Sequence, residues 1–234
     1  MRYYLNIDHY TEFLSGSSAL HLDSYMMEDL VQSNQSEWSW KFRTFKAGFD
    51  LFCGLVALPI IAILSVALLV LNPLLNRGPL FFTQMRAGLD GREFRMWKFR
   101  TMVFSEAETR DPNAPVEEGR ITPLGRIMRK TRIDELPNFF NVLRGEMSVV
   151  GPRPDAVSHA EHYSDNVIGY WERHRVKPGI TGLAQVEHGY AEDEDATAIK
   201  AKYDNIYVRR SCGRLDLYII ARTFFVMIRG FGAR

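Results

Sequence analysis

The sequence has little cysteine: two residues, Cys53 and Cys212, in a chain of 234. Two thiols so far apart exclude a disulfide framework and a zinc site built from thiolates. The first 40 residues also lack the apolar core of a secretory signal peptide, because acidic residues interrupt them. We therefore expect residues 1–45 to form a loosely structured polar extension, and the domain after the membrane segment described below to be cytosolic.

The chain also lacks a strong net charge, which is +1 at pH 7, and it has no helix-turn-helix or other nucleic-acid-binding motif. Its charges are nevertheless unevenly distributed. Acidic residues gather in segments 106–118 and 187–195, whereas basic residues gather beside a long apolar run and in segment 120–132. A basic block next to a membrane segment favours anionic headgroups or phosphate ligands, so we expect no nucleic-acid partner.

The apolar run extends from Leu51 to Leu75 without a charged residue. At about 1.5 Å per residue, a helix of this length can cross a hydrocarbon core of ~30 Å. Basic residues, which mark the cytoplasmic side of a membrane, lie on both flanks, for example Lys46 and Arg77. One interpretation is a tilted spanning helix that tolerates Pro59; the other is a re-entrant hairpin that breaks there and returns to the same face. The flanking charges favour the hairpin.

About 160 residues follow this segment, enough for one domain with its own core. Strand-like segments 79–84 and 93–102 flank an Asp-Gly turn at Leu89-Asp90-Gly91, which predicts a β-hairpin. Residues 104–120 are acidic and contain prolines, which predicts a mobile surface loop. The expected fold class is therefore α+β, mainly α with a small β-hairpin.

Two helices are predicted after this loop. The first, within residues 121–132, is basic and amphipathic, which suits a membrane interface. In the second, Asp134 is placed to cap the N-terminus, Pro137 fits the first turn and Gly145 ends the helix. Residues 215–228 are too short to span a bilayer and predict either an interfacial helix or a core helix.

Asp134 admits a second interpretation because of the charges around it. From Arg120 to Arg153, seven Lys or Arg residues accompany three acidic residues. Cations or a bound metal keep adjacent carboxylates such as Asp134 and Glu135 ionised, and an ionised Asp is a competent phosphoryl nucleophile. Arg153 lies between two prolines that restrict its backbone, so it fits either phosphate binding or a structural salt bridge.

Two weaker patterns stand outside this segment. His159 and His162 have a spacing that can indicate a metal, but the sequence offers no further ligand set, and we expect none to bind there. The basic residues from Arg173 to Lys177 fit either a site for a lipid phosphate or a solvated basic face.

Six motifs occur in order along the chain: Lys98-Phe99-Arg100-Thr101-Met102, Thr122-Pro123-Leu124-Gly125, Asp134-Glu135-Leu136-Pro137-Asn138, Asn141-Val142-Leu143-Arg144-Gly145-Glu146-Met147-Ser148, Val150-Gly151-Pro152-Arg153-Pro154 and Lys177-Pro178-Gly179-Ile180-Thr181-Gly182-Leu183-Ala184-Gln185-Val186. Each one is a weak signal, but the ordered set is specific. It closely resembles the bacterial sugar transferases, the monotopic phosphoglycosyl transferases, over roughly residues 46–230.

The resemblance implies an enzyme that transfers a sugar 1-phosphate from a UDP-sugar to undecaprenyl phosphate, a polyprenol phosphate. It would release UMP and pass through a covalent aspartyl intermediate with ping-pong kinetics. The product would prime exopolysaccharide, capsule, O-antigen or glycoconjugate synthesis at the bacterial inner membrane, with the catalytic domain facing the cytoplasm. Membrane lipids and a second copy of the chain are compatible further partners.

A non-catalytic membrane adaptor on the same scaffold is the alternative, and the intact motif residues favour the enzyme. By position, Asp134 would be the nucleophile, Glu135 together with Asp134 would bind Mg²⁺, and Arg153 would hold a phosphate. The remaining residues expected in the phosphate and substrate site are Arg132, Lys98, Arg100 and Pro154.

The family also has a broken re-entrant helix, which together with the amphipathic interfacial helices predicted above would make this chain a monotopic membrane protein. Lys46 and Asp50 match the start of that helix, so we expect it at residues 46–77, followed by a cytosolic transferase domain at residues 78–234. The family's Ser-Pro break lies about thirteen residues after the Asp, where this chain has Ala62 and Ile63. Pro59 comes about one helical turn earlier, so the break is either shifted or made differently.

Overall fold

A computed structural model of the protein describes residues 38–103, 118–188 and 194–229. Most of the expected N-terminal extension and of the acidic loop at 104–120 lies outside these residues, as does much of the acidic segment 187–195. The described part is mainly helical, with a two-stranded antiparallel hairpin and a second, parallel pair of short strands. The fold class predicted from the sequence is confirmed in this coarse form, although the parallel pair was not expected.

Helix α3 (Trp40–Leu75) contains the apolar run and is long and apolar enough, by length and composition, to cross a membrane. The Ser39 side chain caps it by accepting a hydrogen bond from the Phe42 amide at 3.2 Å. Its buried residues recur at intervals of three, four or seven positions along one stripe, whereas the other faces expose large apolar side chains such as Ile63 and Val70. The buried stripe consists of Lys46, Asp50, Gly54, Ala57, Ile61, Leu68 and Asn72.

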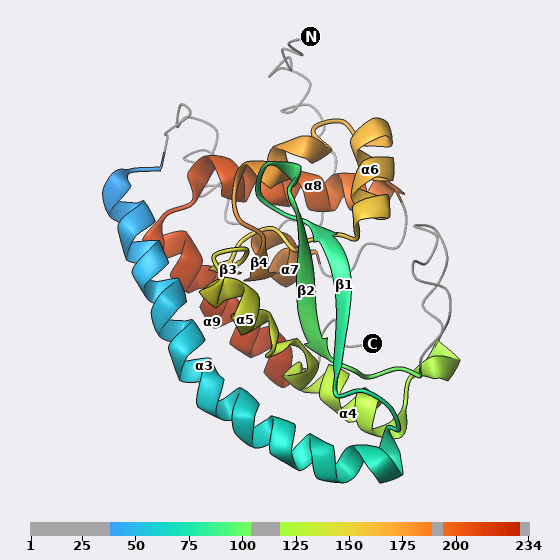
Figure 1. Cartoon of the computed structure of the whole chain (residues 1–234). Helices are drawn as coiled ribbons and strands as arrows, with labels where there is room; N and C mark the ends of the chain where they lie inside the picture. The colour runs from blue at the N-terminus through green and yellow to red at the C-terminus, as the bar shows by residue number, and fades with distance from the viewer. Residues whose placement is uncertain (1–37, 104–117, 189–193, 230–234) are drawn as a thin grey trace. The chain divides into compact units, whose positions relative to one another are not determined.

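The helix is continuous through Pro59, and Pro73 also lies inside it. Figure 1 shows α3 as a long, gently curved helix that runs along one side of the domain rather than as two helices joined at a sharp break. A proline removes one hydrogen bond from a helix and commonly bends it. The membrane hairpin expected at Pro59 therefore stays a prediction.

Polar contacts fasten the N-terminal part of α3 to the domain. The Lys46 ammonium donates to the carbonyl of Val150 at 2.9 Å and to Asp216 at 2.8 Å. One carboxylate oxygen of Asp50 accepts from the hydroxyl and the amide of segment 148–149, at 3.0 and 2.9 Å. Both side chains are buried, so these bonds form out of water and hold the helix to β3 (Ser148–Val150) and α9 (Gly213–Arg229).

Arg100 fastens the other end of α3. Its guanidinium donates to the carbonyls of Asn76, of Pro79 at 2.8 Å and of Met102 at 3.0 Å. In return, the Asn76 side chain donates to the carbonyl of Arg100 at 2.8 Å. Since both ends of α3 are bonded to the same domain by buried polar groups, they are held on one body of protein.

The expected β-hairpin is confirmed as β1 (Phe81–Ala87) and β2 (Glu93–Phe99), joined through the 3₁₀ turn η1 (Leu89–Gly91). The strands pair antiparallel, from Phe81 opposite Phe99 to Ala87 opposite Glu93. Because side chains alternate along a strand, Arg86 and Lys98 lie on the same face of the hairpin. The opposite face carries the stacked rings of Phe81 and Phe99.

The next segment corrects the predicted cap at Asp134. Helix α4 (Pro123–Lys130) is capped by Thr122, and α5 (Asn138–Leu143) has Pro137 at its cap position and ends, as expected, before Gly145, whose φ is +74°. Asp134 instead lies in a separate 3₁₀ turn, η3 (Ile133–Glu135). The cause is Arg132, which adopts a left-handed conformation (φ 57°) and separates the turn from α4.

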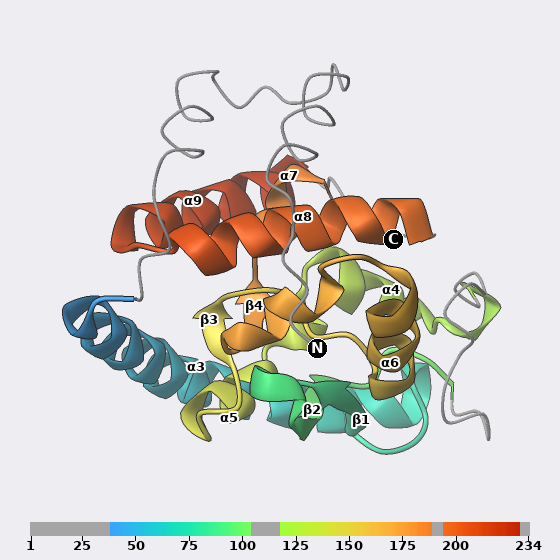
Figure 2. The same ribbon diagram turned by 90° about the horizontal axis from the view of Figure 1, so that it is seen from above.

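The remaining elements are α6 (Val157–Asn166), η4 (Tyr170–Arg175), β4 (Gly179–Thr181), α7 (Leu183–Glu187), α8 (Glu194–Arg210) and α9, with a 3₁₀ turn η2 (Glu118–Arg120) before α4. Strands β3 and β4 pair in parallel. Figure 2 shows α8 and α9 side by side as one layer, with the hairpin and α5 on the other side of these two strands. The predicted helix at 215–228 is confirmed within α9, which buries Ile219 fully and exposes Leu217 and Phe224.

Candidate active site

The structure brings together carboxylates and cations from three separate segments. Turn η3 supplies Asp134 and Glu135, strand β2 supplies Lys98, and the loop after β3 supplies Arg153. The two nitrogens at the end of the Arg153 guanidinium each donate to a different oxygen of Glu135, one at 3.1 Å. The Lys98 ammonium donates to the same carboxylate at 3.1 Å, and Arg132 lies 3.9 Å from it.

These cations fix the charge of Glu135, which is only 7% exposed. Burial by itself would raise the pKa of the carboxyl, but Arg153 and Lys98 hold that pKa well below its usual range. Glu135 is therefore ionised and occupied by hydrogen bonds at both oxygens.

Asp134 is buried to the same extent but has a different environment. Its Oδ1 atom is buried and has no hydrogen-bond partner among the described residues. Burial raises the pKa of Asp134; Lys98 partly offsets this effect and the neighbouring Glu135 charge adds to it. The chain therefore holds one tightly bound carboxylate beside one with a free oxygen, and that oxygen can attack an electrophile or bind a cation.

Cations outnumber acids at this site, which favours an anionic ligand. Lys98, Arg132 and Arg153 lie within 4 Å of Glu135, against the two negative charges of the carboxylates. A phosphate or diphosphate that enters the cluster would balance the excess. Of the two roles left open by the sequence, the structure shows the salt bridge of Arg153, and phosphate binding by Arg153 stays a prediction.

Arg86 is a member of this region that the sequence analysis missed. It is partly buried, it donates to the carbonyl of Pro154 at 3.0 Å, and desolvation together with Arg153 lowers its pKa to about 10. Its position on the same hairpin face as Lys98 is the signal that would have found it, once the strand register was fixed. Pro154 enters the site through this backbone carbonyl.

Arg100 is not brought into the cluster. Two of its guanidinium nitrogens donate to the carbonyls of Asn76 and Pro79 after α3 and the third donates to that of Met102 after β2, so in this structure Arg100 fastens that end of the helix. Lys46 and Asp50 likewise hold α3 to the domain, and Pro59 lies exposed on it.

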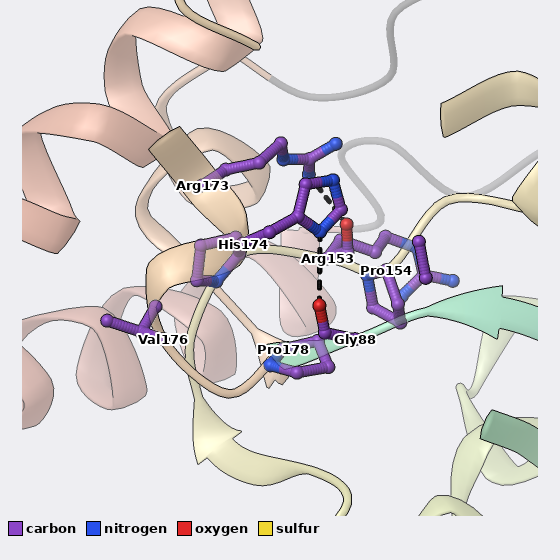
Figure 3. A pocket seen from close by; sticks show the side chains of 9 residues that line it. Gly88, Arg153, Pro154, Arg173, His174, Val176 and Pro178 are labelled. Carbon is purple, nitrogen blue, oxygen red and sulfur yellow. Dashed lines mark hydrogen bonds between the residues drawn. The ribbon is translucent and has the colours of Figure 1, made fainter. Parts of the chain in front are cut away.

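The sequence left two interpretations open for the basic segment 173–177, a site for a lipid phosphate or a solvated basic face. Neither holds for its first two residues. Arg173 is 3% exposed and pairs with Asp155 and with Asp204, the latter at 2.8 Å. The ring of His174 lies 3.2 Å from the Gly88 carbonyl, and burial lowers the pKa of His174 to about 4. Figure 3 draws this contact as a dashed line. Both side chains are thus internal parts of the domain rather than a solvated face.

Whether Mg²⁺ fits can be judged from the two carboxylates. No cluster of three or more His, Cys, Asp or Glu side chains suited to a metal occurs among the described residues. Mg²⁺ is commonly held by only one or two carboxylates, with substrate phosphates and water completing the shell. The free, buried Oδ1 of Asp134 beside the ionised Glu135 fits that mode of binding.

Comparisons with known proteins agree with a site for phosphate ligands. A family model described as bacterial sugar transferase matches residues 41–230. A UDP-N-acetylgalactosamine-undecaprenyl-phosphate N-acetylgalactosaminephosphotransferase of Aeromonas hydrophila is 41% identical over 189 residues, which are 81% of this chain and 45% of the relative. A UDP-glucose:undecaprenyl-phosphate glucose-1-phosphate transferase of Klebsiella pneumoniae is 42% identical over 177 residues, 70% of this chain and 38% of the relative.

An undecaprenyl-phosphate galactose phosphotransferase of Salmonella typhimurium is 36% identical over 218 residues, 87% of this chain and 44% of the relative. The chain thus spans less than half the length of these three curated relatives. The names of these relatives share undecaprenyl phosphate and differ in the sugar.

Proposed function

The chain belongs to the bacterial sugar transferase family, and we propose that it transfers a sugar 1-phosphate from a UDP-sugar to undecaprenyl phosphate, with release of UMP. The observation that carries this proposal is the pair Asp134–Glu135 in its cationic cluster, where one carboxylate oxygen is free and the other carboxylate is held by Arg153 and Lys98. The names of the relatives supply the two substrate classes.

In the first half-reaction, the free Oδ1 of Asp134 attacks the phosphorus atom that bears the sugar. A new bond forms between this oxygen and phosphorus, the bond from phosphorus to the bridging oxygen breaks, and UMP leaves with that oxygen. The intermediate is an acyl phosphate that links Asp134 to the sugar phosphate. Attack requires the ionised form of Asp134, which the Lys98 charge favours.

In the second half-reaction, a phosphate oxygen of undecaprenyl phosphate attacks the same phosphorus atom. The bond between Asp134 and phosphorus breaks, and the carboxylate is restored. The product is undecaprenyl diphosphate bearing the sugar. Because both half-reactions use one carboxylate, we expect ping-pong kinetics.

The cations act on the charge that builds up on the transferred phosphoryl group. Arg153, Lys98 and Arg132 already surround Glu135, so phosphate oxygens entering the cluster meet donors that need little rearrangement. Asp134 and Glu135 would hold Mg²⁺ together with the donor diphosphate, and the ion would supply neutralisation of the bridging and leaving oxygens.

The contacts of α3 support a location on one face of a membrane. Its outward faces expose apolar side chains, whereas its two ends are bonded to one domain through Lys46 and Arg100. A helix that crossed the bilayer once would place these two ends on opposite sides of a hydrocarbon core of ~30 Å, although both are bonded to one domain. A monotopic arrangement, with both ends and the site on the cytoplasmic face of the inner membrane, keeps them on one side, and α9 adds a further exposed apolar face. There the product would prime the synthesis of a surface polysaccharide or glycoconjugate.

The reaction is tested by incubating the purified chain with Mg²⁺, undecaprenyl phosphate and either UDP-glucose, UDP-galactose or UDP-N-acetylgalactosamine while UMP is measured. At least one donor should release UMP. Asp134→Asn should lower kcat by about 10³-fold or more, equivalent to about 4 kcal/mol, because an amide is a poor nucleophile. Asp165→Asn, at an exposed position on α6, is the matched control and should keep full activity. Full turnover by Asp134→Asn would refute the mechanism.

The acidic limb of the pH profile tests the environment of Asp134. Burial raises the pKa of its carboxyl above the ordinary value of about 3.9, so kcat/KM for the UDP-sugar should fall as the pH drops through that raised pKa. Lys98→Met removes a cation that lowers this pKa, and the limb should therefore move to higher pH. Lys98→Arg keeps the charge and should leave the limb near its original position. A limb that stays in place in Lys98→Met would contradict this assignment.

The one-sided membrane arrangement is tested by cysteine labelling. In a chain with Cys53→Ala and Cys212→Ser, single cysteines are introduced at the exposed positions Thr44 and Arg77, on either side of the apolar run. A membrane-impermeant maleimide should label both positions in inverted membrane vesicles and neither in intact spheroplasts. Labelling of the two positions from opposite sides would rule out the monotopic arrangement.

A further inference from the structure

The loop that carries Arg153 is held at four consecutive backbone carbonyls. Prolines at 152 and 154 restrict its backbone and leave two of its residues without an amide donor. The four bonds come from different parts of the fold: Gly179 N to Pro152 O at 2.8 Å, Arg173 Nη2 to Arg153 O at 2.6 Å, Arg86 Nη1 to Pro154 O at 3.0 Å and Ala87 N to Asp155 O at 3.1 Å.

Of these donors, Arg173 is the one that bonds to the peptide of Arg153 itself. Figure 3 shows its guanidinium reaching that carbonyl from the segment that also carries His174. Arg173 comes from η4, about twenty residues further along the chain, and it touches no part of the Asp134–Glu135 pair in the described contacts.

Arg173 is itself fixed by a buried network of balanced charge. Its guanidinium bonds to Asp155, lies 2.8 Å from Asp204 and donates to the Tyr170 hydroxyl at 3.1 Å. Lys200 donates to Asp155 at 2.9 Å, so two cations face two carboxylates. A buried arginine held on several sides has little freedom to move, and its bond to the Arg153 carbonyl is correspondingly well placed.

The direction of the Arg153 side chain depends on that placement. Two parallel bonds from a guanidinium to a carboxylate form only within a narrow range of orientations. A displacement of about 1 Å in a group that positions a reacting phosphate can reduce the rate by about 10²-fold. The Arg153 guanidinium therefore keeps its orientation only if the backbone that carries it is rigid.

We propose that Arg173 is a positioning residue for the transfer reaction, which holds the Arg153 peptide so that its guanidinium stays aligned with Glu135 and with the donor diphosphate. This proposal rests on the proposed function, because the aligned group serves phosphoryl transfer. Arg173 acts through the Arg153 peptide, and the network of Asp155, Asp204 and Lys200 serves to keep it in place.

A double-mutant cycle tests this role. Arg173→Lys keeps the charge balance but loses the planar fork that bonds to Asp155 and to the Arg153 carbonyl together. We expect kcat/KM for the UDP-sugar to fall about 10- to 100-fold in the wild-type background, and by less than about twofold in an Arg153→Ala background. Arg209→Lys, at a half-exposed arginine that pairs with Glu172, is the matched control and should change little. Equal losses in both backgrounds would show a merely structural role and overturn the proposal.

Unfolding of the wild type, the two single variants and the double variant in denaturant distinguishes a failure of this proposal from a failure of the proposed function. If the wild type releases no UMP from any donor, the proposed function fails, and the unfolding cycle decides about Arg173. Non-additive losses of unfolding free energy at positions 153 and 173 would support the positioning role, and additive losses would overturn it. If Arg173→Lys does not fold, Tyr170→Phe, which removes only a hydroxyl bonded to Asp155 and Arg173, replaces it under the same criteria.

Discussion

The buried carboxylate of Glu135 is the point on which the site depends. A charge out of water is stable only when it is paired and hydrogen-bonded, and Glu135 obtains its partners from β2 and from the loop after β3. Docking of the hairpin, the turn η3 and that loop is thereby coupled, because each brings one member of the same cluster. Removing Glu135 would leave Lys98 and Arg153 without the carboxylate that they share.

The carboxylates of Asp134 and Glu135 have different environments, which suit them to different tasks. The pKa of Glu135 is held down by Arg153 and Lys98, whereas the pKa of Asp134 is raised by burial. Adjacent acids whose pKa values move apart are typical of sites in which one group reacts and the other organises charge. The left-handed residue Arg132 makes this possible, since it places both acids in a turn of their own rather than at the cap of α5.

Local sequence patterns predicted those features of the structure that depend only on neighbouring residues. The hairpin and the end of α5 at Gly145 followed from turn residues and periodicity, because those signals lie within a few positions of the element. The same local signals wrongly placed Asp134 at a helix cap, and its role beside Glu135 was expected from the family resemblance. Arg86, Arg100 and Arg173 were missed or misassigned, since their roles depend on carbonyls brought near by the fold, and a sequence gives no sign of which arginine will meet a carbonyl.

The central claim is that Asp134 carries the sugar phosphate between the two half-reactions. Its most direct test is the mass of the protein after incubation with a UDP-sugar and Mg²⁺ but without undecaprenyl phosphate, followed by an acid quench, peptide mapping and fragmentation of the peptide between Asp134 and Glu135. We expect a mass increase equal to one sugar phosphate on the peptide that contains Asp134, and its loss when the acceptor is added. A protein that turns over with both substrates but never gains this mass, or that gains it at Glu135, would contradict the account.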